Sequence, residues 1–247
     1  MASTPGEPTE PERQPTTPRD PLPAFVDWIL GALIAIGGLF ALVGGSAIVV
    51  FVDREVVAEE VAADAVTVTV GTTELTDAEA VEVADAVVSW TGTGLLVTGI
   101  AMLAFAAGYV VLRHRAHRRA GTDGRVSTFA THALLGAVAT VALSFVPVSA
   151  AFGGAVAGYL ERGTSDRAAG AGALAGVLPA LPVLVAGAFV IGGLVSGLLA
   201  VDLVGTAIVV GAATFLALAL LATVSAVLGA LGGYLGGRFA ERRARER

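Results

Sequence analysis

The sequence contains no cysteine and no lysine. Without cysteine, the chain has no disulfide, no thiolate nucleophile and no cysteine metal ligand. All 15 basic residues are therefore arginine, and they stand against 21 acidic residues. Acid-rich surfaces without lysine stay hydrated in concentrated salt, which favours an origin in a halophilic archaeon. A genome rich in GC would also favour arginine over lysine.

Charge is scarce as well, and it is missing altogether from five long apolar runs. Charged residues make up 15% of the chain and hydrophobic residues 55%, which is too little polar surface to coat a soluble fold. A transmembrane helix needs about 20 apolar residues. Each run reaches that length without Asp, Glu, Lys or Arg, and the five runs are residues 28–52, 91–112, 129–160, 168–201 and 203–237. The composition predicts an all-α, polytopic membrane helix bundle.

The N-terminal half divides into a tail and a pair of spans. Residues 1–23 hold seven of the ten prolines and almost nothing to bury, so we expect a disordered tail. Residues 24–112 are expected to form a transmembrane helix pair. Between its two helices, segment 53–89 carries ten carboxylates and one arginine, and we expect it to fold as a small acidic cap.

Local motifs give this acidic segment some expected structure. Valine and threonine alternate over residues 66–70, which predicts a short strand that turns at residues 71–72. Thr76 and Glu79 form a T-x-x-E capping box. This motif predicts the start of a helix that leads into the second span.

Two arginine clusters predict the orientation. Segment 113–128 follows the second span as a basic loop, and segment 238–247 is a basic tail. Arginines in short segments next to a span stay in the cytoplasm. Both termini are therefore expected in the cytoplasm, and segment 53–89 outside it. The arginines expected to meet lipid headgroups and fix the topology are Arg113, Arg115, Arg118, Arg119, Arg242 and Arg243.

The number of spans in residues 129–237 follows from parity. Because both flanking segments are basic, an even number of helices should lie between them. Pro147 divides the run 129–160, and a helix over 148–160 would reach only about 20 Å. That helix either thins the bilayer or enters it halfway. We expect a four-helix module and about six transmembrane helices in total; the alternative is five.

Glycines recur at helical spacing in this module. Segment 154–160 repeats segment 229–235 at five of seven positions, so we expect the two in equivalent positions. Small residues four apart let helix backbones approach closely in lipid. The glycines predicted to pack helices together are Gly154, Gly158, Gly172, Gly176, Gly229, Gly233 and Gly237. In the first span, Gly31, Gly38 and Gly45 recur every seven residues. Oligomer contacts and a pore-lining face are the alternatives.

Few residues bear chemistry. His114 and His117 lie three apart, but the neighbouring arginines disfavour a cation, so we expect lipid headgroups there. His132 lies about one turn inside the third span, and we expect no acidic partner for it within the spans. A satisfied imidazole is therefore expected rather than a proton relay. No catalytic, cofactor or metal site is predicted, and an enzyme is not expected.

Four blocks in the C-terminal half carry a family resemblance: residues 144–147, 153–160, 172–179 and 230–235. In this order they resemble a haloarchaeal domain-of-unknown-function family of small Gly-rich membrane proteins, over about residues 129–240. The resemblance implies an archaeal origin and a four-span module. It brings no activity and no functional residues.

The expected function is that of a non-enzymatic structural or interaction protein of the cell membrane. Pumps and intramembrane hydrolases need ionisable groups or an activated nucleophile at membrane depth. A passive channel or facilitator for a small solute is the alternative, because hydroxyls and broken helices can line a path. The expected partners are membrane lipids and either a second copy of the chain or another membrane protein. Nucleic acid and cofactors are not expected.

Overall fold

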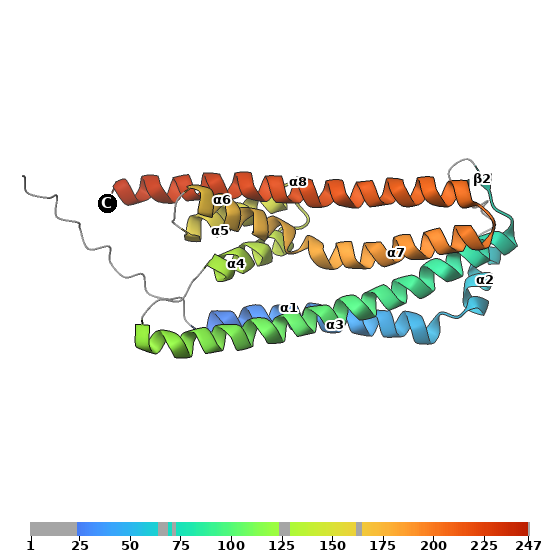
Figure 1. The fold of residues 1–247 in the computed structure, drawn as a ribbon, viewed down its shortest axis with the longest axis horizontal. Coiled ribbons are helices and arrows are strands. Elements are labelled where there is room, and N and C mark those ends of the chain that lie inside the picture. The colour runs from blue at the N-terminus through green and yellow to red at the C-terminus, as the bar shows by residue number, and fades with distance from the viewer. Residues whose placement is uncertain (1–23, 64–68, 71–72, 124–128, 162–164, 247) are drawn as a thin grey trace, which may run out of the picture.

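The computed structural model describes residues 24–63, 69–70, 73–123, 129–161 and 165–246, and these are almost entirely helical (Figure 1). The expected tail over residues 1–23 lies outside the described residues. The elements are α1 (Ala24–Phe51), α2 (Arg54–Ala63), β1 (Thr69–Val70), β2 (Thr73–Glu74), α3 (Asp77–Asp123), α4 (Phe129–Ala142), α5 (Ser149–Glu161), α6 (Ser165–Val177), α7 (Ala180–Ala200) and α8 (Val204–Arg245). The all-α class is confirmed.

Two helices, α3 with 47 residues and α8 with 42, run the length of the molecule, and α1 is shorter, with 28 residues (Figure 1). α1 lies against α3. α7 lies between α3 and α8 and contacts both (Figure 1). The capping box begins α3 as its sequence predicts: the backbone N–H of Thr76 donates to the Glu79 carboxylate at 2.8 Å. α3 then continues through residues 113–123, which we expected as a loop. Arginine and alanine in this stretch are strong helix formers, so nothing stops the helix at the end of its apolar run.

One end of the molecule is acidic, and we call it the acidic end. It contains α2, the β1–β2 pair, the start of α3 and the turn between α7 and α8 (Figure 1). β1 pairs with β2 antiparallel, with Thr69 opposite Glu74, and the connecting residues 71–72 lie outside the described residues. Asp202 turns the chain from α7 into α8 with a left-handed φ of 60°. Leu75, Val83 and Leu198 pack this end together.

The other end is rich in arginine, and three short helices gather there. α4, α5 and α6 have 14, 13 and 13 residues, or about 20 Å each. α5 and α6 lie beside the arginine-rich part of α8 and α4 packs on both of them, whereas α7 lies beside the other part of α8 (Figure 1). α4 and α5 form a hairpin that turns at Pro147, as predicted. α6 and α7 follow one another with an interruption at Leu178 and Pro179.

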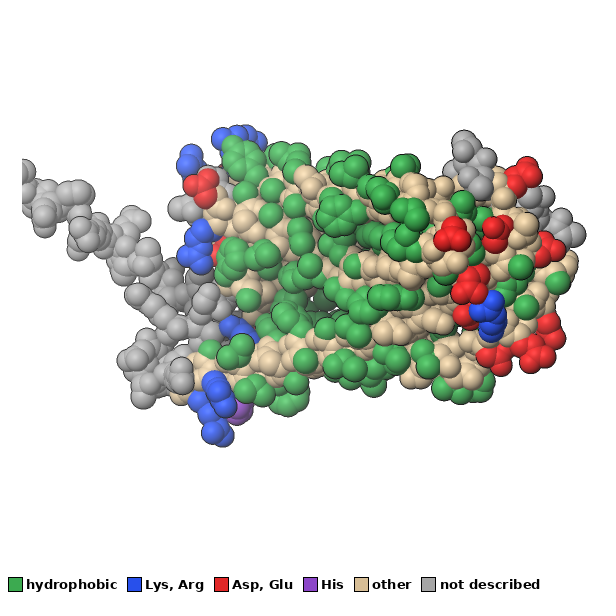
Figure 2. Space-filling view, turned by 45° about the vertical axis from the view of Figure 1, so that its right-hand side comes forward, with side chains coloured by type: hydrophobic (Ala, Val, Ile, Leu, Met, Phe, Trp, Pro, Cys, Tyr) green, Lys and Arg blue, Asp and Glu red, His purple; other side chains and the backbone are tan. Residues whose placement is uncertain are grey.

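Among the described residues, four helices are long and apolar enough to cross a membrane, by length and composition: Phe25–Phe51, Asp77–Ala116, Ala180–Ala200 and Val204–Arg245. The expectation of six full spans is not confirmed, because α4, α5 and α6 are each shorter than the roughly 30 Å of a bilayer's hydrocarbon core. Figure 2 shows the matching surface pattern, with most of the visible arginines at one end, most of the visible carboxylates at the other and hydrophobic side chains between them. These features suggest a membrane-spanning protein.

Candidate functional site

The glycines of α8 form close backbone contacts with α5 and α6. A Cβ added to Gly154 would collide with the backbone of Gly229, and one added to Gly158 would collide with Gly233. Because the residue numbers rise together, α5 runs parallel to α8. The two echoing segments, 154–160 and 229–235, therefore pack directly on each other at the same level.

α6 packs on the neighbouring face of α8 in the opposite direction. A Cβ on Gly172 would meet Gly229 and Gly233, and one on Gly176 would meet Ser225 and Gly229. Gly237 faces Ala168 in the same interface. We call this three-helix contact the α8 seam. The structure brings all seven glycines predicted to pack helices into it, and the backbones touch because no side chain stands between them.

A second glycine stripe lies between α1 and α3, and we call it the α1–α3 seam. Gly38 faces Gly99 and Met102, and a Cβ on Gly45 would lie 2.8 Å from the Gly92 carbonyl. Gly31 faces Val110. The three glycines of α1, seven residues apart, therefore all face α3. They contact more side chains than the glycines of the α8 seam do.

A buried charge cluster closes the α1–α3 seam at the arginine-rich end. The Arg113 Nε donates to the Asp27 carboxylate at 3.0 Å, and the Tyr109 hydroxyl donates to it at 2.7 Å. Thr131 of α4 adds a third donor at 3.2 Å. Asp27 is 4% exposed and Arg113 8%. The carboxylate thus holds three helices together.

A second buried carboxylate, Glu161, closes the α8 seam at the same end. The His132 Nδ1 lies 2.9 Å from its Oε2, and the Arg167 Nη2 lies 3.1 Å from its Oε1. Glu161 is 4% exposed, whereas the side chain of Arg167 is 61% exposed. Arg167 also lies over the ring of Phe129 at 6.0 Å from its centroid. This cluster ties α4, α5 and α6 together and opens toward water.

Two expectations change here. His132 does have an acidic partner, which we missed because Glu161 stands at the very end of its apolar run. Arg113, expected at lipid headgroups, is instead buried against Asp27. Four of the other predicted arginines are exposed, namely Arg115, Arg118, Arg242 and Arg243, and the side chain of Arg119 lies outside the described residues.

Thr140 links the α4–α5 hairpin to the interruption between α6 and α7. Pro179 has no N–H, so the carbonyl of Ala175 loses its helical donor. The Thr140 hydroxyl lies 3.3 Å from this carbonyl and 3.1 Å from the carbonyl of Gly136, so the two acceptors share its hydrogen. Thr140 is buried. The residue therefore stabilises the broken helix from across the interface.

The turn between α4 and α5, residues 143–148, is exposed and irregular. Its backbone makes a few tight hydrogen bonds, among them Val146 N–H to the Leu143 carbonyl at 2.8 Å. Within the part of the chain that the structure describes, nothing donates to the carbonyls of Ser144 and Phe145, and the Ser144 hydroxyl has no partner. The Phe145 side chain is 80% exposed. Polar backbone and a large apolar side chain thus share one small surface.

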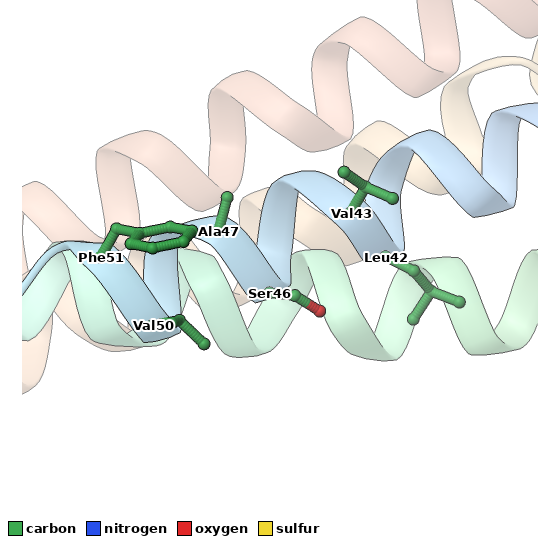
Figure 3. A pocket seen from close by; sticks show the side chains of 6 residues that line it. All are labelled: Leu42, Val43, Ser46, Ala47, Val50 and Phe51. Carbon is green, nitrogen blue, oxygen red and sulfur yellow. The ribbon is translucent and has the colours of Figure 1, made fainter.

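One described hollow lies on the surface of α1. It measures about 410 Å³ and is lined by Leu42, Val43, Ser46, Ala47, Val50 and Phe51 (Figure 3). All six residues belong to α1, so the hollow is a shallow groove on one helix. Among the described residues, no three His, Asp or Glu side chains gather in a way that could hold a metal ion. The geometry of the described residues supports packing and pairing of helices.

Comparison with known proteins gives a family match over part of the chain. Residues 130–239 match the model of DUF5518, described as a family of unknown function. The match begins in α4 and ends in α8, so it covers the short helices and the α8 seam and leaves out α1–α3. No curated protein and no solved structure matches the chain.

Proposed function

We propose that the chain is a non-enzymatic structural or interaction protein of the cell membrane, with four membrane crossings and one re-entrant hairpin. α1, α3 and α8 each cross as one helix, and α6 with α7 makes the fourth crossing. The hairpin of α4 and α5 enters and leaves from the arginine-rich side. This arrangement keeps the parity that the two arginine clusters require, so both termini are cytoplasmic and the acidic end is extracytoplasmic.

Contacts between helices supply the two boundaries of the bilayer in this proposal. On the acidic side, Asp85 is the last acidic residue before the apolar run of α3, and its neighbours Ala86 and Val87 meet Gly193 of α7. Val195 of α7 in turn faces Gly211 of α8. On the other side, the first charged residue of α8 is Arg238. The bilayer therefore covers α8 from about Gly211 to just short of Arg238.

The same contacts support a depth for the hairpin turn within this proposal. Val148 precedes Gly154 by six residues, and Thr223 precedes Gly229 by six residues, so the parallel packing of α5 on α8 puts Val148 level with Thr223. Thr223 is 15 residues from Arg238 and 12 from Gly211, or about 22 and 18 Å along the helix. The turn thus lies near the bilayer midplane.

One observation carries the proposal: the buried charged side chains of the described residues form ion pairs with one another. Asp27 with Arg113 and Glu161 with His132 form pairs at 3.0 and 2.9 Å. A general base, a proton relay or an ion site must leave a group for its substrate or ion. Here the carboxylates join helices, and close backbone packing fills the space beside them. The architecture supports a rigid scaffold.

The test is solute flux in liposomes. The purified protein is reconstituted at several protein-to-lipid ratios, and the flux of ions and small neutral solutes is compared with that of empty vesicles. We expect no difference. Reproducible flux that rises with the amount of protein would reject the scaffold.

A passive conduit for a small solute is the second candidate, and one observation favours it. The α4–α5 turn and the α6–α7 interruption lie at the same depth, joined by Thr140, and interrupted helices at the midplane are common in transporters. If the protein is a conduit, flux in the same assay should change when Ser144 is replaced by alanine. Unchanged flux in that variant would count against a path along the turn.

Membrane lipids are the proposed partners at the arginine-rich end. Arg242 and Arg243 are exposed on the last turn of α8, where they can pair with anionic headgroups. The double variant Arg242→Gln, Arg243→Gln should retain less anionic lipid through purification, as measured by native mass spectrometry. Equal lipid retention would show that headgroups do not bind there.

A further inference from the structure

The turn between α4 and α5 requires a cover that the single chain does not provide. In hydrocarbon, an unpaired backbone carbonyl costs several kcal/mol, so irregular backbone at membrane depth is tolerated only where protein buries it or water reaches it. The carbonyls of Ser144 and Phe145 have no donor among the described residues. With the turn near the midplane, lipid tails cannot satisfy them.

The surroundings of the turn argue for protein rather than water. Four apolar side chains flank it, with exposed fractions of 58% for Val141, 80% for Phe145, 44% for Val148 and 52% for Phe152. A water-filled path at this depth would need polar walls. An apolar rim around a few polar groups is instead the arrangement of a protein–protein interface, in which a large aromatic side chain supplies much of the affinity.

We propose that this turn is the contact between two copies of the chain. Among the described residues, the carbonyls of Ser144 and Phe145 are acceptors without a donor, and the Ser144 hydroxyl is a donor without an acceptor. A surface with both is self-complementary: across a two-fold axis, each Ser144 hydroxyl donates to a carbonyl of the other copy. The two Phe145 rings then pack beside this pair of bonds. The dimer rests on the proposed function, and it names the partner and the site.

The test exploits the absence of cysteine. In the variant Ser144→Cys, the new thiols lie next to the two-fold axis, and a disulfide forms when the Cα atoms are within about 7 Å. The protein is reconstituted in vesicles of phosphatidylcholine and phosphatidylglycerol, oxidised with copper phenanthroline and examined for covalent dimers. The matched control is Leu220→Cys, which is 64% exposed at a similar depth on α8. We expect efficient cross-linking at position 144 and little at position 220.

A second measurement, free of cysteine chemistry, is photobleaching of single fluorescent molecules in vesicles over a dilution series. We expect two-step bleaching for the unmodified chain. Phe145→Ala should weaken dimerisation on the order of tenfold, and Ser144→Ala about sevenfold through loss of two symmetry-related bonds. The position of the dimer–monomer transition along the dilution series measures both.

Four results would overturn the dimer. Equal cross-linking at positions 144 and 220 would mean random collision. Single-step bleaching at every dilution, or a partner of different mass cross-linked at position 144, would mean that another membrane protein or none covers the turn. Reaction of the 144 thiol with an impermeant maleimide would mean that water reaches it. Flux in the same vesicles would reject the scaffold without deciding the dimer, so the two failures are distinguishable.

Discussion

The α1–α3 seam and the α8 seam solve the same packing problem with different spacing. In the α1–α3 seam, glycines seven residues apart meet a mixture of side chains and backbone. In the α8 seam, glycines four residues apart meet backbone on two partner helices at once. Both seams end at the arginine-rich end with a buried carboxylate, Asp27 in one and Glu161 in the other. Successive residues of α4, Thr131 and His132, reach one carboxylate each.

The difference between the two clusters lies in their access to water. The side chain of Arg113 is 10% exposed, whereas that of Arg167 is 61% exposed. The first cluster is therefore enclosed by protein, and the second opens toward the solvent. The stability of each seam therefore depends on its ion pair as well as on its packing. Removing one partner costs more unfolding free energy when protein encloses the remaining charge than when water reaches it.

The largest expected effect comes from breaking the enclosed cluster. Asp27→Asn leaves Arg113 buried without its counter-charge and should cost about 3 kcal/mol of unfolding free energy. Glu161→Gln should cost less, about 1 kcal/mol, because water solvates the exposed Arg167. Both are measured by unfolding in mixed detergent micelles with increasing SDS. Equal losses would remove the distinction between the clusters.

The next effect tests the packing of the α8 seam. In Gly158→Ala, the new Cβ has only the Gly233 backbone to displace, so the seam must open, at a cost of about 2 to 3 kcal/mol. Gly108→Ala is the matched control, since a Cβ at Gly108 meets nothing within 4 Å. The same SDS titration compares the two. If both variants unfold together, close packing at Gly158 contributes no stability.

The smallest effects come from two buried threonines, Thr140 in α4 and Thr98 in α3. Thr140 shares its hydrogen between two carbonyls, so Thr140→Val should cost about 1 kcal/mol. Thr98, in α3, is buried and its hydroxyl has no partner among the described residues. Thr98→Val should therefore leave stability unchanged or raise it slightly. A larger loss for Thr98→Val than for Thr140→Val would reverse this account of the hydroxyls.

Much of the helical framework could be predicted from local sequence signals. The Thr76–Glu79 box, the break at Pro147 and the glycine spacing act within one helix or between neighbouring turns, so the sequence displays them directly. The partners of Asp27 and Glu161 could not be read in the same way. They depend on which helices meet at one end, and they join residues 86 and 29 positions apart in the chain.

The short helices needed the structure for a different reason. A run of 32 apolar residues, 129–160, satisfies the composition of one long span, two short spans or a half-membrane hairpin. Hydropathy records how apolar a segment is and contains no measure of depth. The contacts of α5 with one end of α8 are the observation on which the proposed re-entrant hairpin rests.

The depth of the α4–α5 turn tests the central claim most directly. Single cysteines at Ser144, Asp166 and Glu74 are spin-labelled in vesicles, and their accessibility to oxygen and to a water-soluble nickel chelate gives the depth of each. The re-entrant hairpin predicts the greatest depth at position 144, with positions 166 and 74 at water-exposed ends. A label at position 144 that is as accessible to nickel as the one at position 74 would contradict the hairpin and favour six full spans.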